Sequence, residues 1–333
     1  MATTAPRIPD QCAESNHGAL AATDLLTLFD LASHEVHFLL ELGRRLKADY
    51  TPWRDHFAQR AICLLFEKPS LRTRVSFEVG FARFGGTVVY LDHQSNRIGE
   101  RESIADYGRN LERWCDALVA RVHKHATLEA LAAATRVPVV NALCDQHHPV
   151  QALADMLTLT EHGFSPVHGH LAWVGDGNNV CRSLVEACAA LGCRMTVVTP
   201  PGFELDAATG STALARAMRT GARLSFTTDI AAIAGADAVY TDCWISMGEA
   251  DSDRKRAALQ PYQVNARLMQ IAGPRANFMH CLPAHRGEEV TDEVIDSPNS
   301  IVFDQAENRL HMQNALLLAL LDPAAARAAV ARA

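Results

Sequence analysis

The sequence predicts an α/β protein with two doubly wound parallel-sheet domains, which are joined by long helices and enclose the active site in the cleft between them. Short apolar segments that suit strands buried on both faces alternate with segments of helical periodicity. This alternation stops at a linker over residues 163–169 and then starts again. A length of 333 residues also corresponds to about two domains.

The first half of the chain contains four predicted strands, at residues 61–66, 87–91, 117–121 and 137–141. A helix is predicted over residues 33–48, with Ser33 as its N-cap. Further helices are predicted from Ser70 to Phe84, over residues 128–135 and from Pro149 onward. Because parallel strands need crossover connections, which are usually helices, this order of elements favours βαβ units.

The second half repeats the pattern. Its predicted strands are residues 170–175, 194–199, 238–242, 277–282 and 300–303, and a helix is predicted over residues 178–191. An apolar helix over residues 309–321 and an alanine-rich tail follow. We therefore expect one domain over residues 1–150, with residues 309–333 packed back on it, and a second over residues 151–308.

The charge balance and the composition exclude two classes of protein. The chain has 31 Lys+Arg against 38 Asp+Glu, which gives a formal net charge of −7. A nucleic-acid-binding protein needs a basic surface to neutralise phosphates, so no nucleic-acid partner is expected. With 48% hydrophobic residues, the chain is also too apolar to be mainly disordered.

The cysteines and the chain ends favour a cytoplasmic protein. Nine cysteines are scattered without a Cys-x-x-Cys pair, as expected for buried thiols in a reducing compartment. No apolar run approaches the roughly 20 residues that span a bilayer, so no membrane partner is expected. The first 18 residues lack the apolar core of a signal peptide.

Ligands of open parallel sheets bind beyond the carboxyl ends of the strands, so the residues there are the candidate site. The first predicted strand leads into Ser70-Leu71-Arg72-Thr73-Arg74 at the start of a helix. A helix N-terminus, two hydroxyls and two guanidiniums suit a phosphate group. A capped helix with solvated arginines is the alternative, and the glycine spacing of a nucleotide P-loop is absent.

Two more strand ends of the first half carry polar groups. Arg121 ends the third strand, where taken alone it is interpreted as a surface or ion-pairing residue. His148 and Gln151 flank Pro149, which suits the first position of a helix. These two side chains suit hydrogen bonds to a carbonyl group, with a buried structural histidine as the alternative. Because adjacent histidines rarely share one metal ion, we expect no metal site.

The strand ends of the second half offer a turn, a carboxylate and a thiol. Residues 175–180 begin like a dinucleotide-binding fingerprint, but Val180 replaces the third glycine, so no dinucleotide cofactor is expected. Asp242 and Ser246 precede Gly248 and suit an ammonium partner. Cys281 lies in an apolar segment that does not favour a reactive thiolate.

Six of these segments, in this order, resemble motifs of the aspartate/ornithine carbamoyltransferase family, and within it the ornithine branch. They are residues 70–74, 148–151, 175–179, 242–248, 280–283 and 306–309, and the similarity extends from about Asp24 to Leu321. The resemblance implies transfer of the carbamoyl group of carbamoyl phosphate to the side-chain amine of L-ornithine. It also implies a homotrimer with active sites between subunits, and no cofactor.

The resemblance further implies which residues act. Carbamoyl phosphate would be bound by Ser70, Leu71, Arg72, Thr73, Arg97, Arg121, His148, Gln151, Cys281, Leu282 and Arg309. Ornithine would be bound by Asn179, Asp242, Ser246 and Met247. The catalytic set would be Arg121, His148, Gln151, Asp242, Cys281 and Arg309.

The sequence departs from the family pattern at three places. Leu71 replaces a common threonine, which leaves only its backbone N–H for a phosphate. Arg97 stands where the family usually presents a glutamine to the neighbouring subunit, and residues 1–23 carry no family motif. Two alternatives to ornithine transfer stay open: another amine acceptor, such as putrescine or an N-acylated ornithine, or a catalytically silent metabolite-binding paralogue.

Overall fold

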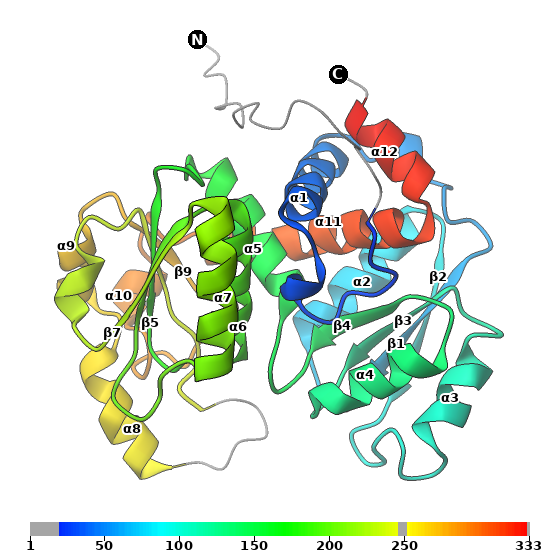
Figure 1. Cartoon of the computed structure of the whole chain (residues 1–333), viewed down its shortest axis with the longest axis horizontal. Coiled ribbons are helices and arrows are strands. Elements are labelled where there is room, and N and C mark those ends of the chain that lie inside the picture. Colours follow the sequence, from blue (N-terminus) through cyan, green and yellow to red (C-terminus); the bar gives the residue numbers. More distant parts are fainter. Residues whose placement is uncertain (1–19, 246–251, 332–333) are drawn as a thin grey trace.

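Two parallel sheets, one in each half of the molecule, organise the computed structural model, which describes residues 20–245 and 252–331 (Figure 1). The strand orders are β2-β1-β3-β4 and β7-β6-β5-β8-β9. The first sheet contains β1 (Ala61–Phe66), β2 (Thr87–Asp92), β3 (Ala117–Arg121) and β4 (Val139–Leu143). The second contains β5 (His170–Val174), β6 (Arg194–Val198), β7 (Arg223–Thr227), β8 (Ala238–Tyr240) and β9 (Asn277–Met279). In each sheet the chain starts inside and winds first to one edge and then to the other, which confirms the doubly wound prediction.

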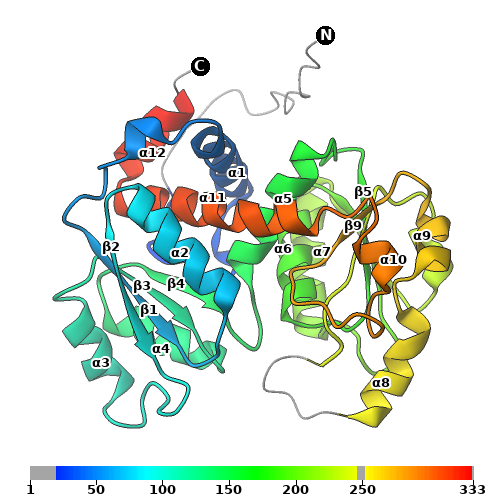
Figure 2. The same cartoon turned by 180° about the vertical axis from the view of Figure 1, so that it is seen from behind.

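The helices connect the strands and join the two halves. Those of the first half are α1 (Ser33–Ala48), α2 (Leu71–Arg83), α3 (Ile104–Leu111) and α4 (His125–Ala134). Those of the second half are α6 (Asn179–Leu191), α7 (Ala207–Thr220), α8 (Asp253–Leu259), α9 (Ala266–Ala272) and α10 (Asp292–Ile295). Helices α5 (Pro149–Glu161) and α11 (Val302–Leu321) lie side by side between the halves, and α12 (Pro323–Ala331) ends the described chain (Figures 1 and 2).

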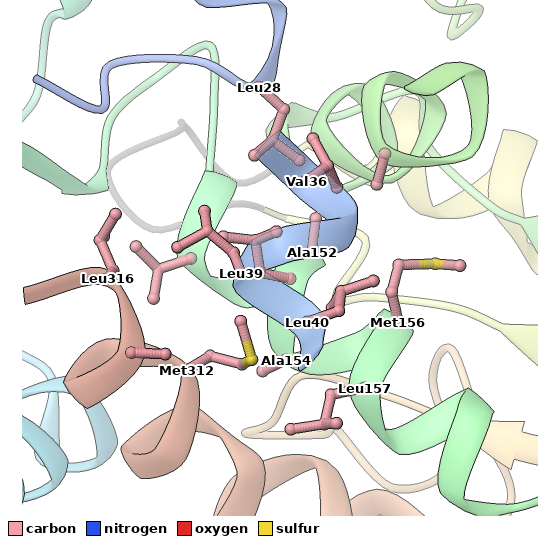
Figure 3. Close-up of a cluster of buried hydrophobic side chains, with 14 of the residues drawn as sticks. Leu28, Val36, Leu39, Leu40, Ala152, Ala154, Met156, Leu157, Met312 and Leu316 are labelled. Atoms are coloured by element: carbon pink, nitrogen blue, oxygen red, sulfur yellow. The ribbon is translucent and has the colours of Figure 1, made fainter. Parts of the chain in front are cut away.

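The largest hydrophobic core joins helices that are distant in sequence. Leu39 of α1, Leu157 of α5 and Met312 of α11 belong to one cluster of buried side chains, which Figure 3 shows. Helix α11 packs on α1, α2 and α5, and α12 packs on α1 and α11. This packing fixes the position of α11, which carries Arg309, against the helices of the first half.

Two predictions of local structure are wrong. Ala32, not Ser33, is the N-cap of α1, and the carboxylate of Glu35 accepts hydrogen bonds from the backbone N–H groups of Ala32 (2.6 Å) and Ala21 (2.5 Å). Glu35 is the third helical residue, so its carboxylate supplies the N3 half of a capping box, while Ala32 has no polar side chain to supply the other half.

The predicted strand over residues 300–303 is the second error. Only Ser300 forms an isolated bridge, with Phe278, and α11 already begins at Val302. In the first turns of α11, polar side chains such as those of Gln305 and Asn308 are buried in the interior. Because the buried face there is polar, the apolar periodicity that marks a helix in a sequence starts only further along.

Several elements were not predicted. Helices α3 and α7 and strand β7 lie in segments of mixed polarity, and the alanine-rich tail folds as helix α12. Strand β7 lies at the edge of its sheet and is largely exposed, so it lacks the continuous apolar pattern of the central strands. Among residues 20–245 and 252–331, no helix has the length and apolar character needed to cross a membrane.

Candidate active site

A cleft of about 890 Å³ opens at the carboxyl ends of the strands and is lined by loops from both halves. All predicted site residues that the structure describes lie along it. They are Ser70, Leu71, Arg72, Thr73, Arg97, Arg121, His148, Gln151, Asn179, Asp242, Cys281, Leu282 and Arg309. Ser246 and Met247 lie outside the described residues, so their predicted roles stay predictions.

The N-terminus of α2 forms one wall of the cleft. Ser70 is the N-cap, and its Oγ accepts a hydrogen bond from the backbone N–H of Thr73 at 3.3 Å. The Ser70 hydroxyl also donates to Thr73 Oγ1 at 3.0 Å. The backbone N–H groups of the first helical turn have no intrahelical acceptor and lie at the positive end of the helix dipole, so they favour an anion.

Three guanidinium groups converge on this wall. Arg72 follows the N-cap, Arg121 ends β3, and Arg309 comes from α11 on the opposite side. Burial, together with the positive charges of Arg309 and Arg72, lowers the pKa of Arg121 to about 10. Burial likewise lowers the pKa of Arg309 to about 10. In the described part of the chain none of the three forms a salt bridge with a carboxylate, so a bound anion would supply the missing negative charge.

His148 and Gln151 lie at the start of α5, where they face the arginines. The His148 backbone N–H donates to Ser183 Oγ at 2.8 Å, and burial, together with Arg309 and Arg121, holds the pKa of its imidazole well below the usual value. The imidazole is therefore neutral near pH 7 and can donate or accept a hydrogen bond. Gln151 Oε1 accepts from Arg309 Nη1 at 2.5 Å.

The opposite wall carries the carboxylate and the thiol. Asp242 accepts hydrogen bonds from Asn178 Nδ2 at 2.8 Å and from the Cys281 thiol at 3.1 Å. Burial raises the pKa of Cys281 well above its usual value, and the negative charge of Asp242 adds to that rise. Cys281 therefore stays a protonated thiol, as its apolar sequence context predicts. Asn179 bridges the halves through a 2.7 Å hydrogen bond from Nδ2 to the Cys144 carbonyl oxygen.

Of the two groups of possible metal ligands among the described residues, one includes residues of the cleft. Ligand atoms of Asp242, His280 and Cys281 lie within 4.8 Å of one another. Both ring nitrogens of His280 already have partners, since Nδ1 accepts from the Leu282 backbone N–H at 2.8 Å and Nε2 lies 3.2 Å from Glu289 Oε1. A metal ion would have to displace at least one of these contacts.

The sequence reasoning missed several residues that line the cleft. The most prominent is Lys68, which is 7% exposed and whose pKa is lowered by burial and by Arg121. Its position just before Pro69 at a strand end was the available signal, but a lysine there is usually solvated. Other lining residues outside the predicted set include His123, Asp145, Asp176, Asn178 and Lys255.

Comparisons with known proteins identify relatives over most of the chain. Residues 23–161 match the family model described as the carbamoyl-P binding domain of aspartate/ornithine carbamoyltransferase, and residues 168–320 match the Asp/Orn binding domain. The ornithine carbamoyltransferase of Shewanella oneidensis is 48% identical over 89% of this chain and 98% of its own length. That of Bacillus subtilis is 43% identical over 91% of this chain and 95% of its own length.

Solved structures agree with these relatives. The ornithine carbamoyltransferase structure from Pyrococcus furiosus is 45% identical, with a TM-score of 0.86 over 90% of this chain and 97% of that chain. The structure from Thermus thermophilus is 44% identical, with a TM-score of 0.81 over 90% of this chain and 99% of that chain. The fold is therefore shared with solved ornithine carbamoyltransferase structures.

Proposed function

Because the chain belongs to the aspartate/ornithine carbamoyltransferase family, we propose that it transfers the carbamoyl group of carbamoyl phosphate to the side-chain amine of L-ornithine. The products are L-citrulline and phosphate. The observation that carries the proposal is the cluster of Arg72, Arg121 and Arg309, which has no salt-bridged carboxylate within residues 20–245 and 252–331. It lies opposite the Asp242 carboxylate across one cleft. An anionic donor and a cationic acceptor fit these two walls.

Carbamoyl phosphate binds against the first half in this proposal. The backbone N–H groups at Leu71 and the hydroxyls of Ser70 and Thr73 hold the phosphate, and Arg72 and Arg121 neutralise it as it departs. Arg97 lines the mouth of the same cleft and adds to this charge. Planar guanidiniums suit this role because they bind phosphate oxygens in a bidentate manner.

His148, Gln151 and Arg309 bind the carbamoyl group. Thr73 and Arg121 lie near its carbonyl oxygen, where negative charge develops during attack. Because these donors are largely buried and already positioned, each is expected to stabilise the oxyanion by about 2.7–4 kcal/mol. The neutral state of His148 lets it act as a hydrogen-bond partner without adding a further positive charge.

Ornithine binds against the second half through Asn179, Asp242, Ser246 and the backbone at Met247. Cys281 and Leu282 lie where its side-chain amine meets the carbamoyl carbon. A lysine-like amine with a pKa near 10.4 loses its proton at pH 7 at a cost of about 4.6 kcal/mol. The neutral amine attacks the carbamoyl carbon, the bond to the phosphate oxygen breaks, and phosphate leaves with the electron pair while the amine proton passes to phosphate or solvent.

The proposed assembly is a cytoplasmic homotrimer whose subunits share active sites. Leu71, Val75 and Val79 support an interface on α2, because they follow one another at helical spacing and are 74%, 44% and 41% exposed. The buried, unpaired cysteines support a reducing compartment. Within the two-domain description, residues 1–150 with 309–333 bind carbamoyl phosphate and residues 151–308 bind ornithine.

The direct test is an assay of the purified protein for citrulline, with carbamoyl phosphate and ornithine as substrates. Citrulline and phosphate should appear in equal amounts. A panel that includes putrescine and N-acetylornithine, ranked by kcat/KM, separates ornithine transfer from transfer to another amine. If no acceptor gives a product, the catalytically silent alternative is correct.

The pH dependence of the reaction should follow the acceptor amine. Between pH 7 and pH 9, kcat/KM for ornithine should rise about tenfold per unit, because the neutral amine fraction rises tenfold per unit below a pKa near 10.4. His148 should add no inflection in this range, since burial holds its pKa well below 6.5. Initial rates at low ornithine concentration test this expectation. A flat profile would indicate that the cleft itself supplies a base for the amine proton.

Subunit complementation tests whether Arg97 acts in a neighbouring site. Arg97 is exposed at the mouth of the cleft, so its guanidinium is accessible to another subunit. If sites are shared, unfolding and refolding an equal mixture of Arg97→Ala and Arg72→Ala subunits should give hybrids in which about a quarter of the sites are intact. Activity should then exceed that of either variant refolded alone. No recovery would restrict Arg97 to the cleft of its own chain.

A further inference from the structure

Asp155 is a fully buried carboxylate that lies just beneath the cleft without lining it. It lies one turn beyond Gln151 on α5. Its Oδ1 accepts two hydrogen bonds, one from Gln151 Nε2 at 2.8 Å and one from Gln305 Nε2 at 2.9 Å. Tyr240 also interacts with this carboxylate, but among the described residues Oδ2 forms no hydrogen bond of ordinary geometry. One oxygen atom therefore holds two amides that come from different helices.

The Gln151 amide connects Asp155 to the wall of the cleft that carries the arginines. With Gln151 Nε2 bound to Asp155, Gln151 Oε1 faces Arg309 and accepts from its Nη1 at 2.5 Å. Arg309 Nη2 in turn donates to Thr73 Oγ1 at 2.8 Å. If the Gln151 amide were flipped, its oxygen would face the Asp155 carboxylate and its N–H groups would face the Arg309 guanidinium. Both contacts are repulsive, so Asp155 selects one orientation of the amide.

The Gln305 amide connects Asp155 to the wall of the cleft that carries the Cys281 thiol. With Gln305 Nε2 bound to Asp155, Gln305 Oε1 accepts from the backbone N–H of His280 at 2.9 Å. His280 directly precedes Cys281 at the end of β9. The same carboxylate oxygen thus fixes contacts that reach both walls of the cleft.

The surroundings of Asp155 show why this carboxylate needs its acceptor contacts. Burial raises the pKa of Asp155 to about 6, and the Gln305 and Gln151 amides, Tyr240 and Arg309 oppose that rise. The Arg309 guanidinium is hydrogen-bonded to Gln151 and not to Asp155, so no direct salt bridge from a described residue compensates the charge of Asp155. A buried charge with this cost would readily be replaced by an apolar residue if it only filled space.

We propose that Asp155 is a positioning residue for carbamoyl transfer. It orients the Gln151 and Gln305 amides, and these amides fix the positions of Arg309 and of the backbone just before Cys281. This inference rests on the proposed function, and it concerns the acceptor atom Oδ1 more than the negative charge. An asparagine can present its carbonyl oxygen to both amides, whereas a leucine of similar size cannot. The two substitutions therefore separate orientation from space filling.

The test compares Asp155→Leu and Asp155→Asn with the wild-type protein. The Leu variant should lose about 30–100-fold in kcat and bind carbamoyl phosphate at least about tenfold more weakly, because misplacing a reacting group by about 1 Å costs about 100-fold. The Asn variant should stay within about threefold of wild type on both measures. Glu35→Leu is the matched control: this buried carboxylate caps α1 outside the cleft, so its loss should lower the melting temperature but not kcat.

Gln305→Met keeps the test decisive if the Leu variant does not fold. It removes only the second amide, so it should raise KM for ornithine about tenfold while the Kd for carbamoyl phosphate, measured by calorimetry, stays within about twofold. A Leu variant with wild-type kcat, an Asn variant as impaired as the Leu variant, or a Gln305→Met variant without effect would overturn the proposal. Calorimetry with carbamoyl phosphate needs no acceptor, so if wild type binds it but makes no citrulline, the proposed function fails while the role of Asp155 is still tested.

Discussion

Replacing Arg121 by methionine should weaken carbamoyl phosphate binding about a thousandfold and at the same time stabilise the ligand-free protein. Arg121 is 7% exposed and contacts the site from the end of β3. Removing a buried charge that pairs with an anionic ligand typically costs about 2–5 kcal/mol of binding, and each 1.4 kcal/mol is a factor of ten. Calorimetry with carbamoyl phosphate measures the loss.

The gain in stability follows from the pKa of the same group. A guanidinium whose pKa falls from 12.5 to about 10 on folding is disfavoured in the folded protein by about 3 kcal/mol at every pH below 10. Methionine removes that penalty, so urea unfolding of the variant without ligand should require more denaturant. The surface variant Arg136→Met, which loses only an exposed ion pair with Glu112, should change neither property. Unchanged carbamoyl phosphate binding in Arg121→Met would contradict our assignment of the phosphate site.

Replacing Asp242 by asparagine should reduce kcat/KM for ornithine by about 100-fold or more and leave carbamoyl phosphate binding nearly unchanged. Asp242 is 7% exposed and lies on the wall opposite the arginines, where its carboxylate accepts a hydrogen bond from the Cys281 thiol. In this variant an ammonium group of ornithine loses its buried, negatively charged partner, which costs about 2–5 kcal/mol of interaction free energy. Steady-state kinetics with each substrate varied in turn separates the two effects.

Asp229→Asn is a suitable control. Asp229 is the exposed N-cap of a short 3-10 helix, Ile230–Ile233, so the substitution changes a carboxylate to an amide in the same half but outside the cleft. It should leave both kinetic constants within about twofold of wild type, since asparagine caps a helix about as well as aspartate. If Asp242→Asn weakened both substrates equally, the two-walled description of the cleft would be wrong. An unaffected kcat/KM for ornithine would remove Asp242 from the acceptor site.

The central strands and the residues that follow them could be predicted because their signals are local. Strand β1 is buried on both faces and reads as a continuous apolar segment, and Pro149 marks the start of α5. Since parallel strands all end at one edge of their sheet, placing Arg72, Arg121 and His148 after strands already placed them near one another. The sequence does not show that the His148 imidazole is neutral or that Arg72, Arg121 and Arg309 have no salt-bridged carboxylate among the described residues.

Elements whose environment is set by distant parts of the chain were not predictable. The N-cap of α1 depends on Glu35 folding back, and the first turns of α11 hide polar residues among other buried polar groups. Lys68 and Asp155 have ordinary sequence surroundings, and only packing against the other helices buries them. The buried polar side chains at the start of α11 have partners far away in sequence, since Gln305 donates to Asp155 and Asn308 donates to Thr158.

The sequence by itself determined the two parallel-sheet halves, the residues at the strand ends and the likeness to the carbamoyltransferase family, because periodicity and short motifs are properties of neighbouring residues. Only the tertiary structure decided how the halves complement each other electrostatically. It brings Arg309 from α11 against Arg72 and Arg121, and it leaves them without a salt-bridged carboxylate in the described chain. Burial then makes His148 neutral and keeps the Cys281 thiol protonated, because removing water from an ionisable group disfavours its charged form.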